Sequence, residues 1–390
     1  MTPSDTAMAP VAALQFAPPR IWAEVHLDHL QRNVREIRKR LRPGVRLMAV
    51  VKADGYGHGL IQTAQAAVEA GAEALAVNLC EEALALRQAG MTVPILVLSP
   101  VHPSQVDAVA THGVEVTVFQ ASWLMEMRRW KQSCEPLRIH IKLDTGMGRY
   151  GLRSREEFEE MLPLLLAEDL HVVGVYTHFA TANQADDSYV REQFVRFMQM
   201  RGWLEEAGFR DVITHCANSA AALRFPEFAL DMVRVGASLY GILPIDKAAA
   251  EGLTIHLKPT ISIRTFIAHV KRVKRGQTIS YDRSYTAASD EWIATLPVGY
   301  ADGWFRGYSG LHVLVEGERV PIVGNICMNQ TMVRLPRRLP IGTVVTLLGE
   351  QAVACVTLDD LAAHIGSIPQ QVLVMLPQHM PRIYLRGDHG

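Results

Sequence analysis

The chain has 390 residues with a formal net charge of −1 at pH 7, and 49% of its residues are hydrophobic. This length and apolar content predict two globular domains with a large core. The near-neutral charge excludes a strong basic field for nucleic acid, and no run approaches the roughly 18 consecutive apolar residues that a membrane helix needs.

The first residues are expected to form a mobile leader. Residues 1–20 are rich in Ala, Pro, Ser and Thr and lack the basic start and long apolar run of a secretory signal. The five cysteines of the chain are scattered and show no C-x-x-C spacing. This disfavours a zinc site and a disulfide framework and fits a reducing cytoplasm.

From about residue 45, short runs rich in Val, Ile and Leu alternate with helical segments. Strands are predicted at residues 45–51, 74–77, 94–98, 114–119, 137–143, 172–176, 212–214 and 232–235. Helices are predicted between them at residues 60–70, 81–89, 121–132, 155–166 and 188–207. Glycines stand where left-handed caps would end several helices, at Gly71, Gly90, Gly113 and Gly208.

Eight strand–helix units in one run are typical of a (β/α)8, TIM-like barrel, which we place at residues 21–253. The strands are continuous apolar runs, as expected for parallel strands covered by helices. A doubly wound open sheet would give the same rhythm, but the polar residues at the strand ends favour the barrel.

Residues 254–390 predict a second, mainly β domain. Strands are expected at residues 260–265, 291–298, 311–315, 320–323 and 343–348, with a hairpin turn at Gly317-Glu318. One helix is expected at residues 357–365. Thr357 and Asp360 would form its capping box, and Gly366 would end it.

Polar side chains gather where the predicted barrel strands end, which is the face that carries the active site in barrel enzymes. In chain order they are Lys52, Lys142, His178, His215 and Arg234. Each alone is more often a solvated or structural residue. Their convergence on one barrel mouth indicates an active site.

The loops after the seventh and eighth strands hold Ser219, Gly236 and Ala237, and such loops often bind phosphate in barrels. A lysine deep in the barrel, such as Lys52, can form a Schiff base with a carbonyl compound. Phosphate, aldehyde and lysine together point to pyridoxal 5'-phosphate.

Several motifs resemble those of the alanine racemase family. In the barrel they are residues 52–59 (KADGYGHG), 142–149 (KLDTGMGR), 177–180 (THFA), 218–220 (NSA) and 233–236 (VRVG). In the second domain they are residues 280–281 (SY), 297–303 (PVGYADG) and 327–330 (CMNQ). The resemblance covers nearly the whole chain beyond the leader, in order. It implies a cytoplasmic isomerase that interconverts L- and D-alanine and supplies D-alanine for peptidoglycan.

The resemblance also implies a role for each matched residue. Lys52 would hold the cofactor and act as one catalytic base, and Tyr281, reaching in from the partner subunit of a homodimer, would be the other. Arg149 and the Met328 backbone would orient the substrate carboxylate, with Tyr300 at the entrance. Further cofactor contacts would come from Tyr56, His178, Asn218, Ser219, Arg234, Gly236 and Ala237. Lys142 matches a position that is often carbamylated in relatives.

Two bases on opposite faces of Cα suit racemisation, because a proton leaves one face and another arrives on the other. Lysine and tyrosine titrate near pH 10 when unperturbed, so their surroundings must shift both. Arginine does not release its proton, so Arg234 would donate to the pyridine nitrogen and leave that nitrogen unprotonated.

Three positions depart from the family's usual pattern. Asp282 stands where a glycine usually follows the catalytic tyrosine, and Asn329 replaces an aspartate. Gln370 replaces a tyrosine that reaches the phosphate and crowds the pocket. Loss of that ring would admit a larger or more polar side chain, so a serine or broad-specificity racemase is the alternative.

Other activities are weighed against these residues. A barrel-type decarboxylase with the same cofactor is disfavoured because Tyr281 and Arg234 match racemase positions. A metal-dependent hydrolase would use His178, His215 and carbamylated Lys142, but the chain offers no clear further ligands, and we expect no metal. A cofactor carrier without catalysis would not need a second base.

Overall fold

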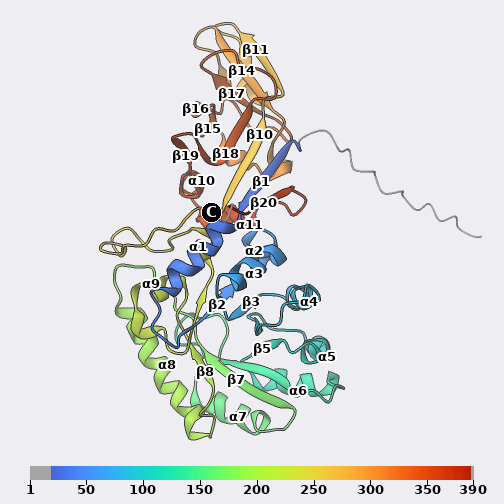
Figure 1. Ribbon diagram of the computed structural model, residues 1–390, viewed down its shortest axis with the longest axis vertical. Coiled ribbons are helices and arrows are strands. Elements are labelled where there is room, and N and C mark those ends of the chain that lie inside the picture. Colours follow the sequence, from blue (N-terminus) through green and yellow to red (C-terminus); the bar gives the residue numbers. More distant parts are fainter. Residues whose placement is uncertain (1–18, 388–390) are drawn as a thin grey trace, which may run out of the picture.

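The computed structural model describes residues 19–387. Its lower part in Figure 1 is an eight-stranded parallel barrel with the order β8-β7-β6-β5-β4-β3-β2-β9. The strands are β2 (Arg46–Val50), β3 (Ala74–Val77), β4 (Ile95–Val97), β5 (Glu115–Val118), β6 (Leu137–Lys142), β7 (Leu170–Tyr176), β8 (Ile213–His215) and β9 (Met232–Val235). Backbone bonds from Asp231 N to Thr214 O and from Arg234 N to Ala217 O join the two ends of the sheet. The predicted (β/α)8 barrel is confirmed.

Helices surround the barrel because each connection returns along the outside of the sheet. They are α1 (Leu27–Arg38), α2 (Lys52–Tyr56), α3 (Leu60–Glu69), α4 (Cys80–Gln88), α5 (Val106–Thr111), α6 (Ala121–Trp130), α7 (Arg155–Leu165), α8 (Ser188–Glu206) and α9 (Ser219–Arg224). The glycines predicted to end helices all have positive φ, between 59° and 104°. Strands β3, β4 and β5 are buried along their whole length, as the continuous apolar runs predicted.

The mainly β part stands above the barrel in Figure 1. It contains β10 (Ile261–Phe266), β11 (His269–Val273), β12 (Thr278–Ile279), β13 (Tyr285–Thr286), β14 (Glu291–Leu296), β15 (His312–Val315), β16 (Glu318–Pro321), β17 (Thr331–Leu335), β18 (Val344–Gln351), β19 (Ala354–Val356), α10 (Leu358–His364), α11 (Pro369–Val374) and β20 (Arg382–Leu385). The mainly β architecture is confirmed. Strand β1 (Ile21–His26) pairs with β10 and with β20, so the start of the described chain completes this sheet.

Local turn and cap chemistry agrees with most expectations. Thr357 Oγ1 accepts from Asp360 N at 3.0 Å, and Asp360 accepts in return from Thr357 N at 2.9 Å. The hairpin turn between β15 and β16 comprises Glu316 and Gly317, one residue earlier than predicted, because Val315 pairs directly with Glu318. Both turn residues have positive φ, 50° and 81°, as a two-residue hairpin turn requires.

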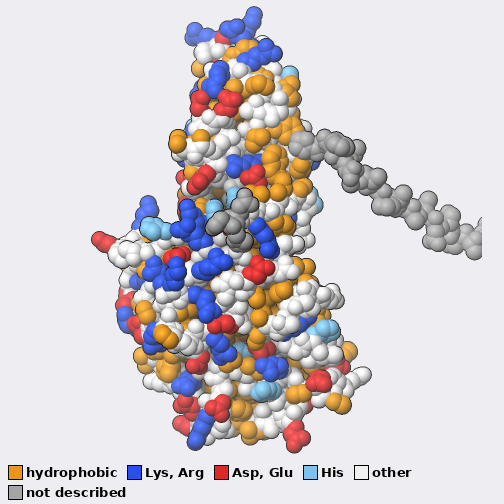
Figure 2. All heavy atoms as spheres, in the orientation of Figure 1, with side chains coloured by type: hydrophobic (Ala, Val, Ile, Leu, Met, Phe, Trp, Pro, Cys, Tyr) orange, Lys and Arg blue, Asp and Glu red, His pale blue; other side chains and the backbone are white. Residues whose placement is uncertain are grey.

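The surface carries no continuous field of one charge on the face seen in Figure 2, where basic and acidic side chains mix over the barrel. None of the helices in residues 19–387 combines the length and apolarity needed to cross a bilayer. Residues 1–18 of the expected leader lie outside the described residues.

Candidate active site

A cavity of about 830 Å³ opens at the carboxyl ends of the barrel strands. Its walls come from the ends of β2, β6, β7 and β9, from the segments that follow these strands and β3, β4 and β8, and from the starts of α10 and α11. The predicted site residues that line it are Lys52, Tyr56, Lys142, Arg149, His178, Asn218, Ser219, Arg234, Gly236 and Ala237. The fold thus brings the predicted barrel residues to one place.

Lys52 begins a left-handed turn directly after β2. Ala53, Asp54 and Gly55 have φ of 55°, 54° and 59°, and Tyr56 follows at 51°. This conformation costs roughly 1–2 kcal/mol for each residue with a Cβ, so surrounding contacts must hold it. The turn places both Lys52 and Tyr56 on the cavity wall.

The C-terminal part of the chain holds this turn. Arg382 of β20 donates through Nε to Gly57 O at 2.9 Å. A Cβ on Gly57 would collide with Leu373 O of α11, and a Cβ on Gly59 would collide with the Tyr384 hydroxyl of β20. The glycines therefore let the second part of the chain pack directly against the turn that carries Lys52.

The cavity carries an excess of positive charge. The lysine, arginine, aspartate and glutamate side chains of its walls are four basic and two acidic ones, namely Lys52, Lys142, Arg149, Arg234, Asp246 and Asp359. Burial lowers the pKa of Lys52, and the nearby Arg149 lowers it further. Burial, together with repulsion by Arg234, lowers the pKa of Lys142 to about 7. Such a site favours a ligand with anionic groups.

Arg234 is fixed beneath the cavity by buried acceptors. Its Nη1 donates to His215 Nδ1 at 2.9 Å and to His215 O at 3.1 Å. Its Nη2 donates to Thr177 O at 2.7 Å and to Cys216 O at 3.2 Å. No acceptor among residues 19–387 bonds to its Nε, which is therefore the donor that remains for a ligand.

His178 is an uncharged ring on the cavity wall. Burial holds its pKa well below the usual value, and the positive charge of Arg234 adds to that effect. Arg234 also separates His178 from His215, with its Nη2 3.4 Å from His178 Nδ1. A metal ion at these two histidines would stand beside a guanidinium, which argues against the hydrolase alternative.

The residues expected to grip a phosphate lie together. Ser219 Oγ accepts from Gly236 N at 3.0 Å, and Asn218 caps α9 by accepting from Ala221 N. A Cβ on Gly236 would fall 2.7 Å from Tyr56 Oη. Any residue larger than glycine at position 236 would therefore fill the narrow space beside Tyr56. The residues present fit pyridoxal 5'-phosphate with its phosphate at this end of the cavity.

We expect Gly236→Ala to weaken cofactor binding by about tenfold or more, because the added methyl would displace the Tyr56 hydroxyl from the phosphate end. Titration of cofactor-free protein with pyridoxal 5'-phosphate measures this. Gly202→Ala is the matched control: Gly202 lies within α8 with nothing within 4 Å of an added Cβ. Unchanged affinity in Gly236→Ala would contradict the assignment.

Three predicted residues of the second part lie away from the cavity. Tyr281, Tyr300 and Met328 are 68%, 44% and 55% exposed, and none of them lines the cavity of its own chain. The structure of a single chain thus leaves the residues predicted as the second base, the entrance tyrosine and one carboxylate contact outside the cavity.

The structure explains two of the positions at which the sequence departs from the family's usual pattern. Asp282 has a φ of 61°, a conformation that glycine adopts freely and that aspartate tolerates better than most residues. Asn329 Nδ2 lies 3.5 Å from Asp302 Oδ2, and Asp302 also pairs with Arg20 at 3.0 Å. An aspartate at position 329 would face Asp302 as a like charge.

Some cavity residues were not singled out from the sequence. Tyr176 ends β7 and stacks on His215, with centroids 4.8 Å apart, and Arg234 lies over the Tyr176 ring at 5.0 Å. Ile368 and Pro369 bring Gln370 to the rim. The position of Tyr176 at a strand end was an available signal, whereas nothing local to Ile368 and Pro369 marks them as a cavity wall.

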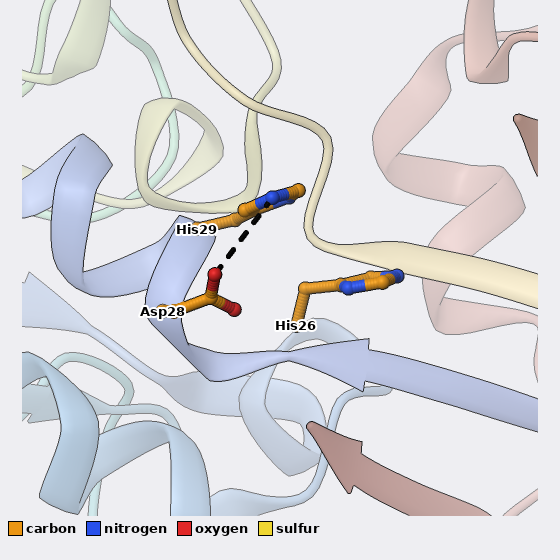
Figure 3. A group of neighbouring side chains, drawn as sticks. All are labelled: His26, Asp28 and His29. Carbon is orange, nitrogen blue, oxygen red and sulfur yellow. Dashed lines mark ion pairs between the residues drawn. The ribbon is translucent and has the colours of Figure 1, made fainter. Parts of the chain in front are cut away.

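A separate group of potential metal ligands lies where β1 meets α1 (Figure 3). The rings of His26 and His29 stack 4.9 Å apart at 16°, and His29 Nε2 lies 3.9 Å from Asp28 Oδ2. Nearly parallel rings do not direct their lone pairs to one point, and His29 Nδ1 already faces Pro259 O at 2.6 Å. The group connects the two parts of the molecule and lies outside the cavity.

Comparison with known proteins gives matches along nearly the whole chain. The family description "Alanine racemase, N-terminal domain" matches residues 25–244, and "Alanine racemase, C-terminal domain" matches residues 260–384. The alanine racemase of Geobacillus kaustophilus is 45% identical over 94% of both chains. Alanine racemase 1 of Bacillus subtilis is 40% identical over 94% of this chain and 93% of its own length.

Solved structures agree with these matches. The crystal structure of alanine racemase from Bacillus anthracis with bound L-Ala-P superposes with a TM-score of 0.92 at 41% identity and covers 95% of this chain and 97% of its own. The histidine racemase of Leuconostoc mesenteroides superposes with a TM-score of 0.84 at 27% identity and covers 95% and 99%.

Proposed function

The chain belongs to the alanine racemase family, and from that premise we propose that it interconverts L- and D-alanine with pyridoxal 5'-phosphate bound at the barrel mouth. The observation that carries the proposal is Lys52, held on a strained left-handed turn at the wall of a positively charged cavity. The lowered pKa of Lys52 gives the amine more of the neutral form that a base requires.

The cavity residues divide into three groups by what they would hold. Tyr56, Ser219 and the backbone of Gly236 and Ala237 would bind the phosphate, with Asn218 fixing the start of α9. His178 would lie against the cofactor ring, and Arg234 would present its free Nε to the ring nitrogen. When bound, the cofactor withdraws electrons from Cα of the substrate and makes its proton acidic.

The remaining residues would act on the substrate. Arg149 and the Met328 backbone of the second subunit would orient the carboxylate. Lys52 would take or return the Cα proton on one face, and a Tyr281 hydroxyl would serve the opposite face. Because Tyr281 lies outside the cavity of its own chain, we propose a homodimer in which the mainly β part of each subunit completes the site at the barrel mouth of the other.

Lys142 is proposed as a carbamylated residue. Its amine is buried, its Nζ donates only to Leu143 O among the described residues, and its pKa is about 7. A neutral amine attacks the carbon of CO₂, an N–C bond forms and one amine proton leaves to solvent. The resulting carbamate is an anion that would pair with Arg149 and hold it toward the substrate.

The extent of Lys142 carbamylation is expected to rise with pH at constant dissolved CO₂. With a pKa of about 7, roughly a tenth of the amine is neutral at pH 6 and about nine tenths at pH 8. Carbon-13 NMR with labelled CO₂ should show one carbamate signal that grows over this range and is missing in Lys142→Met. A signal that persists in that variant would assign the carbamate elsewhere.

Location and role follow as further parts of the proposal. Five free cysteines suit a reducing cytoplasm, and a cytoplasmic racemase would supply D-alanine for peptidoglycan. The serine or broad-specificity alternative depends on Gln370, which lines the cavity where a tyrosine ring would take up more space.

A chiral product assay with L-alanine and L-serine on the cofactor-loaded enzyme tests the proposed function. We expect fast D-alanine formation with little D-serine. Preferential D-serine formation would establish the alternative, and formation of neither would overturn both.

Gln370→Tyr is expected to lower kcat/KM for serine relative to alanine by about tenfold, because the added ring would fill space at the rim, and such volume changes discriminate by roughly 1–3 kcal/mol. Kinetics on both substrates measure the ratio. Gln371→Tyr, one residue further along α11 and outside the cavity lining, is the matched control. If Gln370→Tyr left this ratio unchanged, residue 370 would not determine the preference between alanine and serine.

A further inference from the structure

A chain of buried hydrogen bonds leads from the active site through the interior of the barrel. Arg234 Nη1 lies 2.9 Å from His215 Nδ1, and His215 Nε2 lies 2.9 Å from His140 Nδ1. His140 Nε2 lies 2.9 Å from Glu115 Oε2. The other carboxylate oxygen accepts from Arg138 Nη2 at 2.8 Å. All members except Arg138 are at most 4% exposed.

The donors and acceptors in this chain can be arranged in one way only. A guanidinium has no acceptor, so Arg234 must donate and His215 Nδ1 must carry no proton. His215 Nε2 then carries the proton and donates to His140 Nδ1. By the same reasoning His140 carries its proton on Nε2 and donates it to Glu115.

The positions of the members along their strands explain this path. Residues two apart on a strand face the same side, so Arg138, His140 and Lys142 of β6 all face the barrel interior. Glu115 begins β5 and therefore lies at the opposite end of the barrel from Lys52. A Cβ on Gly174 would fall 2.5 Å from His140 Nδ1, so this glycine of β7 leaves room for the ring.

The charge states of the end groups agree with this arrangement. Burial and the neighbouring Arg234 hold the pKa of His215 well below its usual value. Burial alone would raise the pKa of Glu115, but the hydrogen bonds from His140 and Arg138 and the positive charge of Arg138 outweigh it and lower that pKa. Glu115 is thus an ionised acceptor, and without it the buried N–H of His140 Nε2 would lack a partner.

We infer that Glu115 is a positioning residue for racemisation: by accepting from His140 it keeps both histidines protonated on Nε2, so that His215 Nδ1 holds Arg234 with its Nε directed at the cofactor ring. Only the last link, to the cofactor ring, rests on the proposed function. Without the carboxylate, His140 would also adopt the Nδ1-protonated form. His215 would then carry a proton on Nδ1, which faces an N–H of Arg234, and the guanidinium would move.

The tautomers are measured directly on the wild-type holoenzyme. Nitrogen-15 NMR of histidine-labelled protein, assigned with His140→Gln and His215→Gln, should show a proton on Nε2 and none on Nδ1 in both rings at neutral pH. A proton on Nδ1 of either ring would overturn the inference. Correct tautomers in an enzyme that forms no D-alanine would count against the proposed function and against the last link alone.

Three variants test the consequence for catalysis. Glu115→Met should lower kcat by about tenfold or more with KM changed by less than about threefold, and His215 should become a mixture of tautomers. Glu115→Gln, whose amide oxygen still accepts from His140, should restore both readouts. Arg138→Gln, which keeps the carboxylate, should stay within about twofold of wild type.

The outcomes of these variants separate positioning from folding. A Glu115→Met enzyme with wild-type kcat and unchanged tautomers would overturn the inference. If Glu115→Met does not fold, the Glu115→Gln variant and the wild-type spectrum decide. A Glu115→Gln enzyme whose His140 and His215 keep their proton on Nε2, with near-normal kcat, supports the inference. A Glu115→Gln enzyme with the opposite tautomers and full activity refutes it.

Discussion

Lys52→Ala is expected to lower alanine racemisation by at least about 10⁴-fold in both directions. The amine would be both the group that holds the cofactor and one of the two bases, and loss of a general base alone costs roughly 10²–10⁴-fold. The turn that carries Lys52 is held from the second part of the chain by Arg382 and Leu373, so the variant should remain folded. Chiral assays and the visible absorbance of bound cofactor measure the loss.

The control for this variant separates chemistry from folding. Circular dichroism and thermal unfolding of cofactor-free Lys52→Ala should match those of cofactor-free wild type, because the Lys52 side chain makes no hydrogen bond with the other described residues. An added small amine such as methylamine should restore part of the activity by occupying the vacated space. Retention of more than about one hundredth of wild-type activity in Lys52→Ala would remove this residue from the proposed mechanism.

Tyr281→Phe is expected to lower activity by about 10²–10⁴-fold without loss of stability, because the Tyr281 side chain is 68% exposed and exposed substitutions change stability little. The proposed homodimer makes a sharper test. In a mixture of Lys52→Ala and Tyr281→Phe chains, each hybrid dimer would contain one site with both bases intact. Random exchange should therefore restore about a quarter of wild-type activity from two nearly inactive proteins.

A matched mixture distinguishes complementation from mere stabilisation. Lys52→Ala mixed with the double variant Lys52→Ala, Tyr281→Phe forms hybrids without any intact site and should remain inactive. Sedimentation should give a dimer in all cases. Failure of the first mixture to recover, with hybrid dimers shown to form, would mean that Tyr281 does not act across the subunits.

Local sequence patterns determined the overall architecture. The eight runs rich in Val, Ile and Leu from residue 45 to residue 235 correspond to β2 to β9, because parallel strands that helices cover are rich in apolar residues. Helix ends at Gly71, Gly90, Gly113 and Gly208 were likewise predictable, since glycine adopts positive φ at little steric cost. The barrel mouth could then be located from the polar residues that follow the strands.

The left-handed turn after Lys52 could not be predicted from local preferences. Ala53, Asp54 and Tyr56 all disfavour positive φ, yet contacts from Arg382 and Leu373, more than 300 residues away in the chain, hold the turn. Pairing of β1 with β10 and β20 is also long-range. Such contacts depend on which surfaces meet after folding, and no local pattern records them.

The sequence identified single residues of the site, but it did not determine their protonation states or hydrogen bonds. From the sequence alone, Lys52 and Arg234 could be assigned to the barrel mouth and Gln370 recognised as a departure from the family pattern. Only the tertiary structure lowered the pKa of Lys142 to about 7 and aligned His215 and His140 into a directed hydrogen-bond chain. Burial and neighbouring charge set protonation states, and both arise only when strands distant in sequence close into one barrel.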